Sequence, residues 1–326
     1  MNRETDTPAG RPGRVVKDEA ILDLSHFTEP GQLAAISRIE DVAVVVVPES
    51  LAAAYAAIPT TDVASTLYVP SGVNVRLQTG SLAVGGDGLG AENDVLVVIG
   101  LLLITSPVTG PVPKRIYVVG SVLAPRGSEQ ALGPALAGGT GGVSYYDYAD
   151  GQHVKVISGQ VRLSPAMLAN TAGRPDDILV VAGQVVVTGE VTAVGFGLTL
   201  IAGQLAAPAE SRDVLEPAIQ TQGQVTWYEG GNPRVFNGSA SIGPDFLRLL
   251  PGPTSLVVMG DLTLEETVTE AALQEKVAGL AVFGDVIAPA GLIGVTQFLA
   301  TDVFGDILTS EQARQRASDG PDGSGS

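Results

Sequence analysis

A repeat of about eighty residues runs through most of the chain, and each copy contains four short apolar segments. One kind of segment has central glycines 83 and 77 residues apart and occurs at Val95–Thr105, Ile178–Thr188 and Ser255–Glu265. A second kind has glycines 83 and 81 residues apart and ends in Ala-Pro, at Arg115–Pro125, Leu198–Pro208 and Gly279–Pro289. Self-similarity at a fixed period is the signature of stacked structural units. The repeat therefore predicts an architecture before any catalytic motif is considered.

Twelve glycines mark the centres of these segments and follow one another at intervals of 15 to 24 residues. They are Gly80, Gly100, Gly120, Gly141, Gly159, Gly183, Gly203, Gly223, Gly238, Gly260, Gly284 and Gly305. Three further segments without a glycine lie upstream, around residues 21–25, 42–48 and 65–68. The fifteen segments divide into super-repeats at about 19–90, 91–170, 171–250 and 251–310. This continuity predicts a single elongated domain over residues 19–310.

Each segment has an apolar run, a small residue, a second apolar run and then a proline or polar residues. Val, Ile and Leu dominate, which favours strands over helices. A glycine inside a strand pattern marks a bend or a close backbone approach. The pattern predicts a mainly β fold, a parallel β-solenoid of about fifteen rungs with about twenty residues in each. An antiparallel meander is the alternative, but it would require a hairpin signal between neighbouring strands.

Short helices are expected between some strands, on one flank of the stack, because proline ends several strands and opens a turn of helix readily. The candidate helices are Glu49–Ile58, Gly127–Leu136, Glu210–Ile219, Asp245–Leu250 and Thr269–Val277. Residues 1–18 and 311–326 are predicted to be disordered tails, because their Gly, Ser, Pro and charge content does not support a packed core.

The composition narrows the classes of function. The formal net charge of −17 disfavours nucleic acid as a partner, since nucleic-acid binding requires a basic surface. No signal peptide and no membrane insertion are expected, because no apolar stretch has the necessary length. Cysteine is absent, which is compatible with a cytoplasmic location. Only two histidines are present, and no motif of a known catalytic class is found. The chain is therefore predicted not to be an enzyme, and no cofactor or metal is predicted.

Two sets of polar residues follow the marker glycines. Asp261, Asp285 and Asp306 would form a column of carboxylates if the rungs stack in register, and that column is either a cation site or a solvated edge. Gln occupies the equivalent position at 160, 184, 204 and 224, where an amide ladder would stabilise the stack.

The aromatic residues gather in the third segment of each round. Tyr145, Tyr146, Trp227 and Tyr228 form a candidate interface, while the alternative is that they fill a wide corner of the fold. Many strands are apolar at almost every position, which indicates that both of their faces are covered. The cover is either the flanking helices or another molecule.

The valine-glycine rhythm of residues 183–203 resembles the bactofilins, β-solenoid proteins that polymerise into bacterial cytoskeletal filaments. The resemblance implies a structural scaffold that self-associates, and a homo-oligomer or a protein partner. Ala-Pro elements and the four-segment period depart from that family. A protein-binding module that presents one face to a partner is the alternative function. A carbohydrate-active β-helix enzyme would need convergent charged residues on the strands, which carry few.

Overall fold

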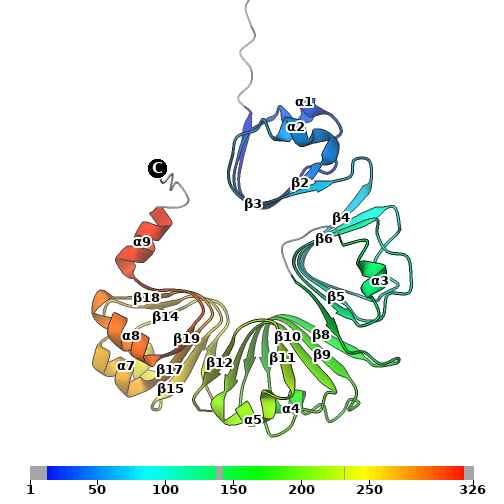
Figure 1. Ribbon diagram of the computed structural model, residues 1–326. Helices are drawn as coiled ribbons and strands as arrows, with labels where there is room; N and C mark the ends of the chain where they lie inside the picture. The colour runs from blue at the N-terminus through cyan, green and yellow to red at the C-terminus, as the bar shows by residue number, and fades with distance from the viewer. Residues whose placement is uncertain (1–12, 137–141, 231, 319–326) are drawn as a thin grey trace, which may run out of the picture. The chain divides into compact units, whose positions relative to one another are not determined.

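The computed structural model describes residues 13–136, 142–230 and 232–318 (Figure 1). The chain divides into two compact units, Met1–Asp147 and Tyr148–Ser326, and each is described by itself. The fold is mainly β, and every strand pair is parallel. This confirms the parallel arrangement over the antiparallel meander.

The first unit contains two sheets. The first sheet has the order β1-β2-β3 and the second has the order β4-β5-β6-β7, so that each strand pairs with the next strand in the sequence. The strands are β1 (Arg14–Asp23), β2 (Ile36–Pro48), β3 (Thr60–Val69), β4 (Asn74–Val84), β5 (Asp94–Ile104), β6 (Arg115–Pro125) and β7 (Val143–Tyr146). The helices between them are α1 (Pro30–Leu33), η1 (Glu49–Leu51), α2 (Ala52–Tyr55) and α3 (Glu129–Leu132).

The second unit contains three sheets. The third sheet has the order β8-β9-β10-β11, with β12 also on β10, and its strands are β8 (Val154–Leu163), β9 (Ile178–Val187), β10 (Leu198–Pro208), β11 (Ile219–Thr221) and β12 (Val225–Tyr228). The fourth sheet comprises β13 (Arg234–Phe236), β15 (Thr254–Val258), β17 (Val277–Val282) and β19 (Ala300–Val303). The fifth comprises β14 (Ala240–Ile242), β16 (Leu262–Leu264), β18 (Val286–Ala288) and β20 (Ile307–Thr309). The helices are α4 (Pro165–Leu168), η2 (Ala209–Ser211), α5 (Arg212–Leu215), α6 (Pro244–Leu249), α7 (Glu270–Lys276), η3 (Ala290–Leu292), α8 (Ile293–Leu299) and α9 (Ser310–Ser318).

Each round of the repeat forms its own parallel stack instead of continuing one ladder. Within the first unit, pairing passes from β1 to β3 and starts again at β4. Within the second unit it passes from β8 to β12 and starts again at β13. In the last round each rung, meaning one repeat segment, consists of two short strands that meet at a marker glycine, as β15 and β16 do at Gly260. The four-segment period is therefore the period of a sheet, and the expectation of an uninterrupted stack is corrected.

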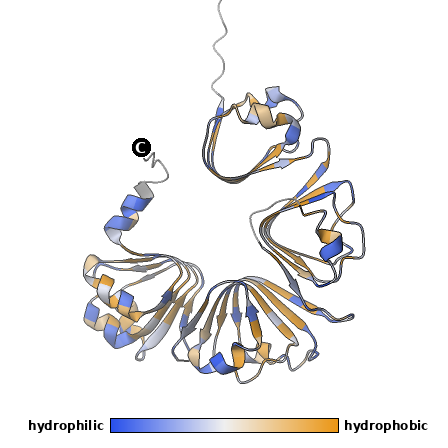
Figure 2. Cartoon of the chain, viewed as in Figure 1, coloured by the Kyte–Doolittle hydropathy of each residue, from blue (hydrophilic) through white to orange (hydrophobic). Residues whose placement is uncertain are grey.

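Sheets pack face to face within each unit, which explains the strands that are apolar on both faces. In β5, Leu96 and Val98 belong to the buried core of the second sheet. Val95 and Val97 point to the opposite face, as neighbours on a strand do, and pack with Val44 and Val46 of the first sheet. In the second unit, Val186 of β9 likewise packs with Val257 of β15. Apolar cover on these faces is intramolecular, and Figure 2 shows the hydrophobic residues along the strands.

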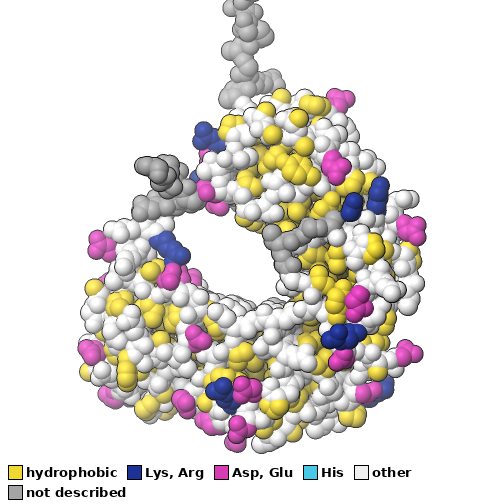
Figure 3. Space-filling view, in the orientation of Figure 1, with side chains coloured by type: hydrophobic (Ala, Val, Ile, Leu, Met, Phe, Trp, Pro, Cys, Tyr) yellow, Lys and Arg dark blue, Asp and Glu magenta, His cyan; other side chains and the backbone are white. Residues whose placement is uncertain are grey.

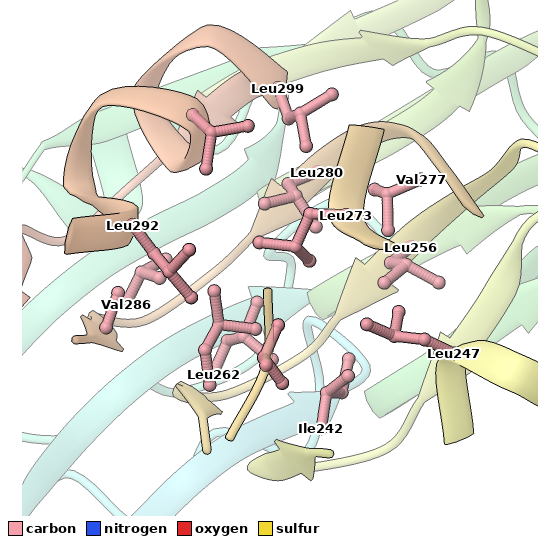
Figure 4. Close-up of a cluster of buried hydrophobic side chains, with 14 of the residues drawn as sticks. Ile242, Leu247, Leu256, Leu262, Leu273, Val277, Leu280, Val286, Leu292 and Leu299 are labelled. Atoms are coloured by element: carbon pink, nitrogen blue, oxygen red, sulfur yellow. The ribbon is translucent and has the colours of Figure 1, made fainter. Parts of the chain in front are cut away.

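The fourth and fifth sheets enclose a core together with the helices that connect their rungs. Leu247, Leu273 and Leu299 come from α6, α7 and α8, and they pack with Leu256 and Leu262 of the two sheets (Figure 4). The helices α6 and α7 contact one another, as do α7 and α8, so that they line one flank side by side (Figure 1). Each helix therefore closes the third side of its rung.

Regular structure extends further toward both ends than the composition of the two tails predicts. The strand β1 begins at Arg14, because its backbone pairs with β2 from Arg14↔Ile36 onward and Val16 is buried. The helix α9 covers 310–318, where a tail was predicted. Residues 1–12 and 319–326 of the predicted tails lie outside the described residues. None of the helices in the described part of the chain is long and apolar enough to cross a membrane.

Candidate functional site

The marker glycines form columns in which each rung approaches the one before it. Register pairs Gly80 with Gly100 and Gly100 with Gly120, and it pairs Gly159 with Gly183 and Gly183 with Gly203 in the same way. A Cβ at Gly120 would overlap the carbonyl oxygen of Gly100, so only glycine permits this approach. The same close approach places Gly223 on Gly203, Gly260 on Gly238, Gly284 on Gly260 and Gly305 on Gly284. Gly141 lies outside the described residues.

The glutamines that follow the marker glycines form an amide ladder. Gln160 Nε2 donates to Gln184 Oε1 at 3.0 Å, and Gln184 Nε2 donates to Gln204 Oε1 at 3.2 Å. Gln160 Nε2 also lies 2.7 Å from the carbonyl oxygen of Met259, which joins the third sheet to the end of β15. These amides therefore hold the rungs in register and link the third sheet to its neighbour in the unit.

The aspartates of the last round form a column of a different kind. Asp261 Oδ1 accepts the backbone N–H of Asp285 at 2.9 Å, and Asp285 Oδ1 accepts that of Asp306 at 2.8 Å. Ser239 begins the column, since its hydroxyl accepts the backbone N–H of Asp261 at 3.1 Å. Each side chain thus serves as the acceptor for the next rung.

A guanidinium from α9 neutralises the end of the aspartate column. Arg316 Nη1 lies 2.9 Å from Asp306 Oδ2 and 3.5 Å from Asp285 Oδ2. Arg316 thus places a positive charge beside two of the three aspartates of the column. Among the described residues, no group of three or more His, Cys, Asp or Glu side chains is arranged to hold a metal ion.

Two of the four candidate interface aromatics lie in the core at equivalent positions. Tyr146 is 3% exposed and its hydroxyl donates to the carbonyl of Ile104 at 2.7 Å. Tyr228 is 1% exposed and its hydroxyl donates to the carbonyl of Val187 at 2.5 Å. Burial raises the pKa of Tyr228 well above its usual value. Both phenols fill a corner of the fold and satisfy a carbonyl two rungs away, so neither is presented to a partner.

The other two aromatics are half-buried. Tyr145 packs against the core of the second sheet, and burial raises the pKa of its hydroxyl. Trp227 lies beneath the guanidinium of Arg212, with 5.5 Å between that group and the ring centre. It also lines a cavity of about 180 Å³ with Leu205, Leu215, Glu216, Ile219, Thr221 and Val225. Of the four candidate aromatics, Trp227 is the one that lines this cavity.

A buried carboxylate holds the turn before β9. Asp177 is 3% exposed and lies 3.0 Å from Lys155 Nζ. The backbone N–H of Arg174, followed by the ammonium of Lys155, lowers the pKa of Asp177 below its usual value. Asn170 accepts from Lys155 at 2.8 Å and donates to the carbonyl of Gly195 at 3.2 Å. Because these polar groups bind one another, the cluster stabilises a loop.

The two histidines and the glycine-rich segment 85–90 each have local contacts of their own. His26 contacts the ring of Phe27 edge-on at 4.7 Å, and the backbone carbonyl of His153 accepts the N–H of Ile178. The glycine-rich segment 85–90 contains a turn closed by the N–H of Gly88 and the carbonyl of Gly85 at 2.9 Å.

Apolar side chains reach the solvent on the helical flank of the second unit. Leu249 at the end of α6 is 79% exposed, and Phe298 on α8 is 82% exposed. Leu249 also borders a cavity of about 370 Å³ with Asn232, Pro233, Arg234, Phe246, Leu250, Pro251 and Thr254. Hydrophobic patches among the neutral and acidic side chains are visible in Figure 3.

No family model, curated protein or solved structure matches this chain.

Proposed function

We propose that the chain is a structural scaffold without enzymatic activity that self-associates, and that its rungs are the coils of parallel β-solenoid segments. A coil in the last round consists of two strands and a helix, as in β15, β16 and α7. The next coil pairs with both strands in parallel register. This three-sided path around an apolar core supports the solenoid interpretation.

The observation that carries the scaffold proposal is the use of the polar columns. Gln184 accepts from one neighbouring rung and donates to the next. Asp285 donates its backbone N–H to one rung and accepts from the next through its side chain. In these two columns the polar side chains hold successive rungs together, which is the role expected in a structural stack.

Self-association follows from how the stacks end. A stack of parallel strands is an open sheet, so each of its two edge strands has one side without a partner strand, and that side can accept another strand. The strand β1 pairs only with β2 in its sheet, and β19 and β20 are the last strands of theirs. Repeat folds of this kind require caps at their ends to remain monomeric.

The test is the size of the full-length protein as its concentration is raised. We expect sedimentation velocity to show species larger than 33.2 kDa that increase with concentration, and negative-stain images to show elongated assemblies. A monomer at every concentration, with no assemblies in the images, would refute the scaffold proposal.

A protein-binding module is the second candidate, favoured by the exposed Leu249 and Phe298. Apolar side chains that are largely exposed on one flank of a soluble protein often mark a docking surface. A variant with L249D and F298D separates the two functions. If the flank serves a different protein, the variant self-associates as the wild type does but loses that partner.

A further inference from the structure

The bend of the first rung of the last round contains an asparagine that is followed directly by glycine. Asn237 and Gly238 lie between β13 and β14, and no other asparagine of the chain precedes a glycine. Asn237 is exposed. The side-chain amide of an asparagine can be attacked by the backbone nitrogen of the next residue, and glycine favours the attack because it has no side chain to hinder it. The pair is therefore a candidate site of covalent modification.

The attacking nitrogen of Gly238 has a different environment from the nitrogens of the last two marker glycines. Gly284 donates its N–H to the carbonyl of Gly260 at 3.0 Å, and Gly305 donates its N–H to that of Gly284 at 3.2 Å. The strands β13 and β14 are the first of the fourth and fifth sheets, so no earlier rung of these sheets offers Gly238 such a carbonyl. A Cβ built at Gly238 would meet nothing within 4 Å. The nitrogen of Gly238 is thus not held in a rung-to-rung hydrogen bond.

The side chain of Asn237 is bound by a guanidinium from the third sheet. Arg162 of β8 donates to Asn237 Oδ1 from Nε at 3.2 Å and from Nη2 at 3.0 Å. Arg162 Nη2 also donates to the carbonyl of Val235 at 2.9 Å, which fixes the guanidinium against β13. Charged donors therefore lie on the oxygen that gains negative charge when Asn237 Cγ is attacked, as they do in an oxyanion hole.

We propose that Asn237 is a site of spontaneous deamidation and that Arg162 activates it. The nitrogen of Gly238 forms a bond to Asn237 Cγ, the bond between Cγ and Nδ2 breaks, and the proton of the Gly238 N–H leaves with the amide group as ammonia. Water then opens the cyclic imide at either of its carbonyls, which gives aspartate or isoaspartate at position 237. The reaction needs no reagent except water, because the attacking and the attacked groups belong to neighbouring residues.

The reaction changes the contact between the third and fourth sheets. Aspartate at this position keeps the oxygen that Arg162 binds and adds a negative charge, so that a hydrogen bond to a neutral amide becomes an ion pair. Isoaspartate instead lengthens the backbone before Gly238, where Gly260 closely approaches it. The two products are therefore expected to have opposite effects on the stability of this bend.

The first experiment incubates the full-length protein at mildly alkaline pH and follows each asparagine by peptide mapping with mass spectrometry. Asn170 is the internal control, because its amide donates to the carbonyls of Arg174 and Gly195. Asn237 is expected to deamidate at least about tenfold faster than Asn170, since those hydrogen bonds of Asn170 must break before its amide can react. If Asn237 stays unmodified, or is modified no faster than Asn170, the modification site is refuted.

A second experiment tests the part of Arg162. R162Q should slow the deamidation of Asn237 by about tenfold, because the charged donors are lost from the transition state. R248Q is the matched control, since it removes a guanidinium of the same unit that pairs with Asp245 on α6. It should deamidate as the wild type does. If R162Q deamidates as fast as R248Q, Arg162 does not activate the site.

N237D mimics the aspartate product and tests the ion pair. It is expected to lower the equilibrium constant of unfolding by about two- to fivefold relative to the wild type, the effect of one exposed ion pair. Urea denaturation measures this change, and the same substitution in an R162Q background should give no gain. Equal effects of N237D in the two backgrounds would show that the product does not pair with Arg162.

Discussion

The stacked glycines allow a comparison that separates backbone strain from rung packing. Gly159 and Gly203 both adopt positive φ angles, of +99° and +147°, so alanine is strained at either position. Gly159 is in the first rung of the third sheet, and a Cβ there would meet nothing within 4 Å. A Cβ at Gly203 would overlap the carbonyl oxygen of Gly183 and would lie 2.7 Å from its carbonyl carbon.

The two substitutions should therefore differ in cost. G159A is expected to lower the free energy of unfolding by about 1–2 kcal/mol, the cost of a left-handed backbone for an L-residue. G203A carries that cost plus about 1–3 kcal/mol of overpacking, because backbone atoms of two rungs must separate. Neither residue has a side chain, so no lost side-chain contact confuses the comparison.

Urea denaturation followed by circular dichroism measures both variants against the wild type. We expect G203A to have the clearly lower midpoint, with the difference between the variants reporting the close approach of the rungs. Equal losses would refute the reasoning, since they would mean that the glycines are required for their φ angles alone.

Two further variants test local features of the fold. D177N should weaken the dependence of stability on pH at acid pH. The pKa of Asp177 is lowered in the folded state, so the unfolded chain takes up the proton first and the stabilisation is lost as the pH falls below about 4. Melting temperatures measured between pH 3 and pH 6 test this, and the same pH dependence in D177N as in the wild type would contradict it. Y228F should lower the free energy of unfolding by about 1–2 kcal/mol, because the carbonyl of Val187 loses its buried donor. Urea denaturation measures the loss. An unchanged free energy of unfolding would contradict this prediction and would show that water replaces the hydroxyl.

Much of the fold could be predicted from the spacing of glycines, because a column of close approaches tolerates no other residue. The strands of the first sheet do not have such glycines. Its bends use Asp18, Asp41 and Asp62, with φ angles of +59°, +50° and +54°. The register of β1, β2 and β3 places these three residues side by side. Aspartate tolerates the left-handed region better than most residues, so it replaces glycine there and conceals the repeat.

The breaks between sheets are marked in the sequence by a second set of glycines. Gly72, Gly151 and Gly230 each precede the first strand of a sheet, and each lies eight residues before a marker glycine. All three adopt positive φ angles. A turn at this point redirects the chain, so the next strand begins a new sheet instead of extending the old one. The spacing of the apolar segments is unchanged across the break, which is why periodicity alone predicts a continuous stack.

Some of the site residues could likewise be predicted from the sequence, and others could not. The glutamine ladder could be predicted, since the identical side chains recur at one register position. The capping box of α9 is visible as Thr309 and Gln312, but the polar composition after residue 310 favoured a tail. The pairing of Arg316 with Asp285 and Asp306 could not be predicted, because it depends on where the helix folds back over the last rung.

The most direct test of the account is the register of the stacked rungs, and the absence of cysteine from the chain makes it simple. Neighbouring strands lie about 4.8 Å apart, within the range that a disulfide bridges. Parallel stacking in register predicts that Q184C with Q204C forms a disulfide under mild oxidation in the folded monomer. Q184C with A206C, which is two residues out of register, should remain reduced. Equal cross-linking of both pairs, or cross-linking of the second pair alone, would contradict parallel stacking in register.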